Sequence, residues 1–392
     1  MNKRIVLAVL IAALTLSPAL IFAGGQSEGN VIKIGFDIPL TGDRPKVGEG
    51  TKFAAEMIKE EINGAGGLDV QGEKYMLDFI YVDNELKAES AVQAAFKLIE
   101  QDKVLAIVGP DGSTQAIPAG QVANDNRTPL ISPWSTNPNT TLNRPYVFRA
   151  CFLDPFQAPV AAKFAQEQFG AKTVSVMYNL EDDYSKTLAE LFKAAWEDKN
   201  GAGSVLNFES YGNKDQDFSV QLTSIIASEP DFLYLPCFYN KVAMIVPQAK
   251  DLGWDKPVMG SDSWGSADLV KLSQGAVKGY YFTTHYAAAG AVGETKAFID
   301  AYEEAYGYTP DDVGALSFDA VNIVLKAIQT AGITGDLRAD REAIKDAIAS
   351  LASYPGITGT MTFTPDGDPI KDAVVVQVND AGEFEFVATL QP

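Results

Sequence analysis

The chain has 392 residues and a formal net charge of −20, with 51 acidic against 31 basic residues. This acidic balance argues against nucleic acid as a partner, because binding to a polyanion relies on Lys and Arg neutralising phosphates. A single histidine weakens histidine-based metal sites and Ser-His-Asp catalysis. Two widely separated cysteines, Cys151 and Cys237, do not form a disulfide framework. We expect two free, largely buried thiols rather than a bridge.

The first 23 residues have the order of a secretory signal peptide. Lys3 and Arg4 provide a basic start, an apolar stretch runs from Ile5 to Leu16, and Ala23 offers a small residue for cleavage. The apolar stretch is shorter than the about 20 residues that prefer to span a bilayer. A retained N-terminal membrane anchor is the alternative. We expect residues 1–23 to be removed on export, which leaves a soluble chain of two or three domains.

Strand and helix patterns alternate twice along the next part of the chain. Val31–Ile38 has an apolar residue at every second position, and Val104–Val108 is wholly apolar, which is typical of a strand covered on both faces. Two runs of such βαβ units predict an α/β fold with two lobes and mainly parallel sheets. Strands are expected at Tyr75–Val82, Pro129–Ser132, Thr173–Tyr178, Val205–Tyr211, Asp231–Leu235, Pro257–Gly260 and Tyr280–His285, and helices around 54–62, 88–99, Ser113–Asn126, Pro155–Phe169, 188–196, Phe218–Ala227 and Lys241–Leu252.

The last hundred residues have a different pattern. Three helices are expected there, followed by short extended segments, of which the last two flank a hairpin turn. The helices are Glu294–Tyr306, Val313–Ala331 and Asp340–Ser350, and the extended segments are Thr360–Phe363, Ala373–Val378 and Glu383–Thr389.

The loops that follow the strands form the candidate site. In open α/β sheets, ligands bind outside the carboxyl ends of the strands. If the two lobes face each other, these loops converge on one cleft. Three come from each run: Pro39–Val47, Gly109–Ser113, Ser132–Pro138, Asn179–Tyr184, Pro236–Tyr239 and Ser261–Trp264.

The loop Gly109–Ser113 leads from an apolar strand into a helix. The start of that helix offers free backbone N–H groups and the positive end of a dipole, which suit a ligand carboxylate. Ser113 could add its hydroxyl to such a site. Ser113 or Asp111 could equally be a helix N-cap, and both roles can hold at once.

The loop Ser132–Pro138 is rich in hydroxyl groups and carries an aromatic residue, Trp134. Ser135 and Thr136 could donate hydrogen bonds to the same carboxylate. The alternative is an ordinary turn, because Ser, Asn and Pro all favour turns.

Two candidates come from the second run. Glu181–Tyr184 begins a helix, where acidic residues complement the dipole, and Tyr184 could cover a ligand. Asp262 could pair with a ligand ammonium in a charge-assisted bond worth roughly 1.5–3 kcal/mol. The alternative for Asp262 is a solvated or helix-capping side chain.

Motifs for catalysis are weak. Residue 261 is Ser where the G-x-S-x-G nucleophile elbow needs Gly, and no P-loop or G-x-G-x-x-G follows a strand. His285, the single histidine, is interpreted as a structural residue near a crossover. Hydrolysis by paired carboxylates stays open in so acidic a chain, but no particular pair stands out.

Nine short segments carry a family resemblance: Ile32–Gly35, Pro39–Gly42, Glu61–Gly67, Val108–Pro110, Ile131–Pro133, Ser135–Pro138, Asp217–Ser219, Gly260–Asp262 and Phe318–Val321. Their order and spacing resemble the type I periplasmic binding proteins of the branched-chain amino-acid class, across nearly the whole chain after the signal segment. The resemblance implies two doubly wound parallel-sheet lobes that close on a ligand by a hinge motion. It implies crossovers near Arg149–Cys151, Tyr281–His285 and Gly359–Phe363, and hence a first lobe of 24–149 plus 284–360 and a second of 150–283 plus 361–392.

The resemblance also implies roles for individual residues. The loops matching Gly109–Ser113 and Trp134–Thr136 hold the α-carboxylate, with Trp134 contributing mainly backbone. Tyr184 and Asp262 come from the second lobe, and Asp262 binds the ammonium. Phe238, and with less support Phe318, shape the side-chain pocket.

Departures from the family pattern leave ligand identity open. Val47 stands where several amino-acid binders have a large aromatic, and Trp134 replaces a small residue. We expect a periplasmic, monomeric component of an ABC importer that meets a permease in the inner membrane, without cofactor or metal. An amino acid, preferably hydrophobic or branched-chain, is the expected ligand. An amide, a urea-like compound, or an aromatic or other carboxylate is the alternative, and a secreted hydrolase is the rival of another class.

Overall fold

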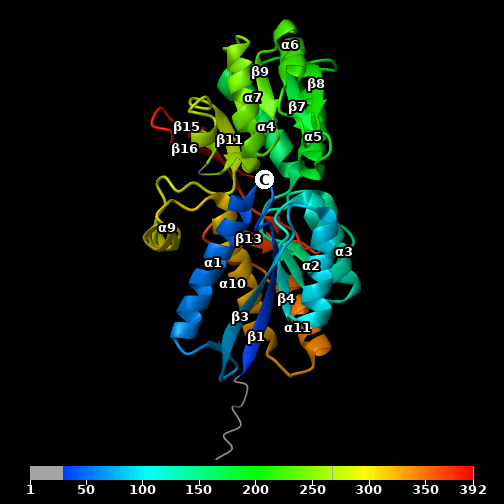
Figure 1. Ribbon diagram of the computed structural model, residues 1–392, viewed down its shortest axis with the longest axis vertical. Coiled ribbons are helices and arrows are strands. Elements are labelled where there is room, and N and C mark those ends of the chain that lie inside the picture. Colours follow the sequence, from blue (N-terminus) through cyan, green and yellow to red (C-terminus); the bar gives the residue numbers. More distant parts are fainter. Residues whose placement is uncertain (1–29, 267, 392) are drawn as a thin grey trace, which may run out of the picture.

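A computed structural model describes residues 30–266 and 268–391, so the expected signal peptide lies outside the described residues. The first half of the chain forms a six-stranded sheet (Figure 1). Its strands are parallel except for the antiparallel pair β2–β3. Their order across the sheet is β2 (Leu68–Val70), β3 (Glu73–Asp83), β1 (Val31–Ile38), β4 (Ala106–Val108), β5 (Leu130–Ser132) and β6 (Val147–Arg149).

A second sheet of seven strands lies beyond the first in the long direction of the molecule. It is parallel from β8 to β11 and ends in two antiparallel edge strands, β15 and β16. The order is β16 (Phe384–Leu390), β15 (Ala373–Val378), β11 (Tyr281–Thr284), β10 (Val258–Gly260), β9 (Phe232–Leu235), β7 (Val174–Asn179) and β8 (Val205–Tyr211). A small antiparallel sheet joins β12 (Tyr354–Gly356), β13 (Gly359–Phe363) and β14 (Pro369–Ile370).

Helices surround both sheets (Figure 1). The helices around the first sheet are α1 (Pro45–Gly64), α2 (Ala88–Phe96, continued by a π-helical turn, Lys97–Gln101), α3 (Ser113–Asp125), α10 (Asp312–Ala331) and α11 (Leu337–Ala349), with α9 (Gly293–Tyr306) at one side. Those around the second sheet are α4 (Asp154–Phe169), α5 (Asp183–Asn200), α6 (Ser219–Ala227), α7 (Tyr239–Asp251) and the single turn α8 (Leu269–Leu272). Of the helices in the described ranges, none is long and apolar enough to cross a membrane.

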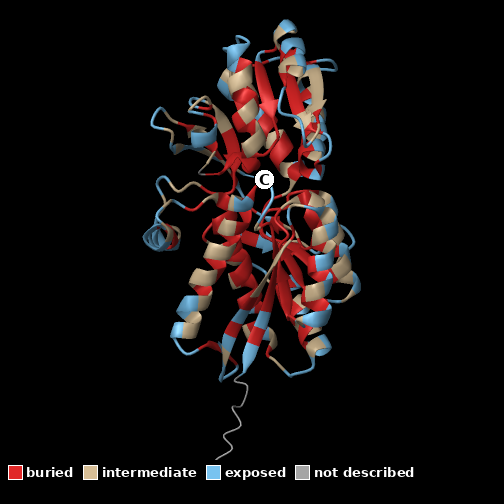
Figure 2. Cartoon of the chain, in the orientation of Figure 1, coloured by how far each residue is buried: buried red, intermediate tan, exposed pale blue. Residues whose placement is uncertain are grey.

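The core follows this division into two sheets. One cluster of buried residues joins the first sheet to α10 and α11, and another fills the second sheet and its helices. Buried residues concentrate on the strands and on the inner faces of the helices (Figure 2). Val47, Trp134 and Val313 belong to the second cluster although their elements flank the first sheet, so the two parts of the molecule touch there.

The expected α/β class and every expected strand and helix are confirmed, and most ends shift by a few residues. The helix expected around 54–62 is longer than predicted, because α1 begins at Pro45, inside the segment expected as the loop Pro39–Val47. Short elements escaped prediction: β2, β12, β14, α8 and two 3₁₀ turns (Pro138–Thr140 and Asp262–Trp264) have too few residues to show a period. Cys151 and Cys237 are free and buried, as expected. The assignment of 24–149 plus 284–360 to one lobe stays a prediction.

Candidate ligand-binding site

Five of the six loops expected at the site meet at one small pocket between the two sheets, and Pro39–Val47 contributes no residue to its walls. The walls lie so close together in this structure that no space for a water molecule remains between them. Six predicted site residues are among its walls, and two others, Ser135 and Thr136, lie buried beside it. The residues that line it are Asp111, Gly112, Ser113, Trp134, Tyr184, Phe238, Asp262 and Ser263.

One end of the pocket is the start of α3. Gly112 is the N-cap residue, and no side chain caps this helix, so the N-cap alternative for Ser113 and Asp111 was wrong. The Ser113 hydroxyl accepts a hydrogen bond from the hydroxyl of Ser135, at 2.9 Å. Thr136 keeps a buried hydroxyl that has no partner among the described residues. Backbone N–H groups at a helix start and a cluster of hydroxyls are donors that an anion needs.

Asp111 is buried at the same end of the pocket. Its Oδ1 accepts a hydrogen bond from the Thr51 hydroxyl at 3.2 Å, and Oδ2 has no partner among the described residues. Burial raises the pKa of Asp111 to about 8, and the Thr51 hydrogen bond offsets only part of that rise. Asp111 is therefore mainly protonated at neutral pH, and a neutral carboxyl does not repel a ligand carboxylate.

Replacing Asp111 by asparagine is expected to change how stability depends on pH. An unfolded aspartate ionises at about pH 4, whereas the folded group holds its proton to about pH 8. In this window the folded state binds more protons, so wild-type stability falls as pH rises, by up to roughly 1.4 kcal/mol per pH unit. Urea unfolding should therefore show that the free energy of unfolding of Asp111→Asn, relative to that of the wild type, is higher at about pH 8 than at about pH 5. The same difference in free energy of unfolding between variant and wild type at both pH values would mean that Asp111 is already ionised in the folded protein.

Trp134 lines the pocket, and the expectation that it contributes mainly its backbone to a ligand stays a prediction. The indole ring packs edge-on against Phe238, with 5.6 Å between ring centres. Its Nε1 donates to Asp312 Oδ2 at 3.3 Å, which fixes the ring between the two sheets. Trp134 is therefore a fixed wall that limits the space for a ligand side chain.

Phe238 and Phe318 differ in position. Phe238 lines the pocket, and the Arg44 guanidinium lies 3.3 Å from its ring centre, a cation–π contact that the sequence pattern did not reveal. Phe318 is not one of the residues that line this pocket. It packs instead against Phe298, with 4.7 Å between ring centres.

The opposite end of the pocket is built around Asp262, which is only 1% exposed. The alternative of a solvated or capping side chain was wrong, because Asp262 is buried and the N-cap of its 3₁₀ turn is Ser261. Its Oδ1 accepts hydrogen bonds from the Tyr184 hydroxyl at 2.6 Å and from Gln157 Nε2 at 2.8 Å. These donors orient a carboxylate that borders the pocket.

His285 approaches Asp262 from the end of β11. Its Nε2 lies 3.3 Å from Asp262 Oδ2, and its ring stacks on Phe152 at 3.9 Å. Burial lowers the pKa of His285 to about 4, so the imidazole is neutral at neutral pH and does not cancel the charge of an ionised Asp262. The histidine lies near the expected crossover, but it also supports the site. His285 could have been predicted as a site residue, because it directly follows the end of β11. Gln157 could not, because it lies inside α4 and follows no strand end.

Arg149 connects the loop Ser132–Pro138 to the turn between β13 and β14. The guanidinium is fully buried, and its Nε lies 2.6 Å from Asp368 Oδ1. It also donates to the backbone oxygens of Ser135, at 2.5 Å, and Asn137, at 2.9 Å. The loop that carries Ser135 and Thr136 is therefore held by a buried ion pair.

The chemistry of this pocket is that of binding. Hydrogen-bond donors at the start of α3, the carboxyl group of Asp262 and the rings of Trp134, Tyr184 and Phe238 all belong to its walls. Within residues 30–266 and 268–391, no three His, Cys, Asp or Glu side chains are grouped to hold a metal ion.

Comparisons with known proteins agree on one family. The family described as periplasmic binding protein matches residues 31–383. A leucine-, isoleucine-, valine-, threonine- and alanine-binding protein from Pseudomonas aeruginosa is 30% identical over 88% of this chain and 89% of that protein. A leucine-binding protein from Thermotoga maritima superposes with a TM-score of 0.83 at 32% identity, over 92% of this chain and 99% of that chain. A branched-chain amino-acid transporter substrate-binding protein from Streptococcus pneumoniae was solved with isoleucine. It superposes with a TM-score of 0.82 at 29% identity, over 91% of this chain and 99% of that chain. This chain belongs to the periplasmic binding protein family.

Proposed function

We propose that the protein is the solute-binding component of an ABC importer and that it binds an amino acid with a hydrophobic, preferably branched side chain. The observation that carries this proposal is the presence of opposite chemistries in one pocket: the start of α3, with the Ser113 hydroxyl, and the Asp262 carboxyl group both line it. An amino acid needs that pair, because its carboxylate requires donors and its ammonium requires an anion. The named ligands of the relatives from Pseudomonas aeruginosa and Streptococcus pneumoniae support the same class.

The site residues take their roles from this arrangement. Ser113, Ser135, Thr136 and the backbone at Gly112 bind the carboxylate, and Asp262 binds the ammonium while Tyr184 and Gln157 orient it. Trp134, Phe238 and Tyr184 enclose the side chain. Asp111, held neutral by burial, lies behind the carboxylate.

The wider assignments follow from the family and the fold. The chain is exported by residues 1–23, works in the periplasm as a monomer without catalysis or cofactor, and delivers its ligand to an inner-membrane permease. The lobes are 24–149 with 284–360 and 150–283 with 361–392. Contacts of α10 with α1, β4 and β5 support the return of the chain to the first lobe.

Calorimetry with three related ligands tests the function. L-leucine should bind with one site per chain, whereas 4-methylpentanoate lacks the ammonium and leucinamide lacks the carboxylate, so each should bind at least tenfold more weakly. Equal binding of leucine and 4-methylpentanoate would assign the pocket to a carboxylate without an ammonium group. Tight binding of leucinamide would remove the carboxylate site from α3. Mass spectrometry of small molecules released from the denatured protein identifies the natural ligand.

A further inference from the structure

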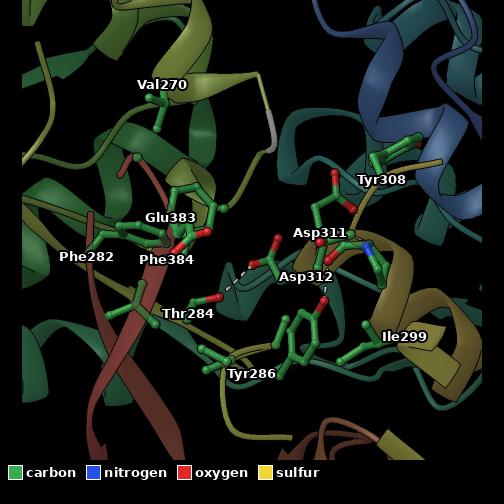
Figure 3. Close-up of a pocket in the computed structure, with 18 of the residues that line it drawn as sticks. Val270, Phe282, Thr284, Tyr286, Ile299, Tyr308, Asp311, Asp312, Glu383 and Phe384 are labelled. Carbon is green, nitrogen blue, oxygen red and sulfur yellow. Dashed lines mark hydrogen bonds between the residues drawn. The ribbon is translucent and has the colours of Figure 1, made fainter. Parts of the chain in front are cut away.

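A second, larger hollow is lined by residues of α9 and β16 and by segments between the two sheets (Figure 3). Its volume is about 660 Å³, within the roughly 300–1,000 Å³ that is usual for small-molecule sites. We call it the α9–β16 groove. Phe282 and Phe384 line it from the second sheet, and Ile299, Tyr286 and Tyr308 line it from the other side. It offers apolar and aromatic surface to a ligand.

The groove is acidic. Asp311, Asp312, Glu303 and Glu383 are among its walls, and no Lys, Arg or His is. The basic groups of this region lie outside the walls: Lys46 pairs with Glu49 and lies 5.0 Å from the centre of the Tyr308 ring, and the buried Lys371 donates to the Thr358 hydroxyl at 2.7 Å. A ligand that enters the groove therefore meets four acidic side chains and no basic one among its walls.

Asp312 is the most informative of these acids, because it is only 2% exposed. Its Oδ2 accepts from Trp134 Nε1 and from the Thr284 hydroxyl, both at 3.3 Å, but Oδ1 has no partner among the described residues. A β-carbon on residue 265, also in the groove wall, would lie 2.8 Å from this Oδ1, so the absence of a side chain at Gly265 lets the carboxyl pack directly against the backbone there. A buried acceptor without a partner is unfavourable unless a donor reaches it.

The neighbouring carboxyl of Asp311 strengthens the case for a positive charge. Its Oδ1 accepts from the backbone N–H of Gly314 at 2.9 Å, which fixes the side chain at the start of α10. Burial raises the pKa of Asp312 well above its usual range, and repulsion by Asp311 raises it further. A cation bound beside Asp312 would offset both effects and so would favour the ionised form of this carboxyl.

The side chains that line the groove indicate which kind of cation it can bind. No group of metal-ligating side chains is present in the described part of the chain, and aromatic and aliphatic side chains make up much of the groove. Aromatic faces near carboxylates attract organic ammonium ions. We propose that the α9–β16 groove binds an organic ammonium ion with an apolar body, whose charged end is held by Asp312 and Asp311. Trp134 separates this site from the amino-acid pocket, and the proposal does not depend on amino-acid binding.

Calorimetric titration with 2-phenylethylammonium chloride tests the proposal, with 2-phenylethanol as the neutral control. The ammonium ion should bind with one site per chain, at least tenfold more tightly than the alcohol. Asp312→Asn and Asp311→Asn should each weaken it at least tenfold. Asp198→Asn, an exposed change of the same charge on α5, and Asp262→Asn, in the amino-acid pocket, should leave it unchanged.

A second variant separates a binding defect from a folding defect. Asn is also a good N-cap, so Asp311→Asn should fold, and thermal melting checks this. Ala288→Phe fills the groove without changing charge, because Ala288 is a half-buried wall residue, and should also abolish binding. Absence of binding to the wild type, equal binding of the alcohol, or full binding by Asp312→Asn overturns the proposal. Loss of binding in Asp262→Asn also overturns it, because the cation would then sit in the amino-acid pocket.

Discussion

Replacing Asp262 by alanine is expected to weaken L-leucine binding by about tenfold to more than a hundredfold. A hydrogen bond to a charged group is worth roughly 1.5–3 kcal/mol, and a change of about 1.4 kcal/mol is tenfold in affinity. Asp262 is the carboxylate that borders the pocket opposite the start of α3, and it is 1% exposed, so little water screens it. Isothermal titration calorimetry with leucine measures the loss.

The Asp262→Asn variant distinguishes the effect of losing the charge from the effect of losing the hydrogen bonds that Asp262 accepts. Alanine leaves Tyr184 and Gln157 without their acceptor, whereas asparagine keeps an oxygen for both. Asparagine removes the negative charge and puts an amide NH2 in the place of Oδ2, beside His285 Nε2. We expect Asp262→Asn to fold like the wild type and still to bind leucine at least tenfold more weakly. Asp198→Asn, with the same loss of charge at an exposed site, should bind normally. Wild-type affinity in Asp262→Asn would remove Asp262 from the ammonium site.

Replacing Asp368 by alanine is expected to lower the free energy of unfolding by about 3–5 kcal/mol, because it leaves a buried guanidinium without its counter-charge. Arg149 is fully buried and its Nε lies 2.6 Å from Asp368 Oδ1. Leucine affinity should fall too, because Arg149 holds the loop that carries Ser135. Urea unfolding measures the first effect and calorimetry the second.

Asp366 provides a matched control in the same turn. Its side chain is exposed, so Asp366→Ala removes the same charge from the same segment with a change expected within about 0.5 kcal/mol. Similar small effects for Asp366→Ala and Asp368→Ala would show that the Arg149 pair contributes little to stability. The two variants together therefore measure the pair and not the overall charge of the turn.

Periodicity was enough to predict the fold, because long amphipathic helices and buried strands leave a repeating pattern. Val205–Tyr211 and Ala373–Val378 were predicted at their observed bounds. The three-residue strand β2 and the single turn α8 escaped, because a segment shorter than two periods has no pattern to detect. Tertiary pairing, such as that of Leu68 with Tyr75, forms these elements.

The site was predictable where it follows strand ends and not elsewhere. Ser113, Tyr184 and Asp262 follow the ends of β4, β7 and β10 within five residues, where the geometry of parallel sheets gathers side chains. Asp312 starts a helix and Gln157 lies inside one, so only the packing of distant segments brings them to the cleft. The direction of the Trp134 ring could likewise not be predicted from the sequence, because its hydrogen-bond partner Asp312 is 178 positions away.

The two buried cysteines make the protein a convenient base for an optical sensor. Burial raises the pKa of both thiols, Cys151 and Cys237, to about 12, so almost no reactive thiolate exists at neutral pH. A maleimide dye should therefore ignore them while the protein is folded. One cysteine introduced at an exposed cleft-edge position such as Lys87 would then be the single labelling site, and its fluorescence could follow the closing of the cleft in real time.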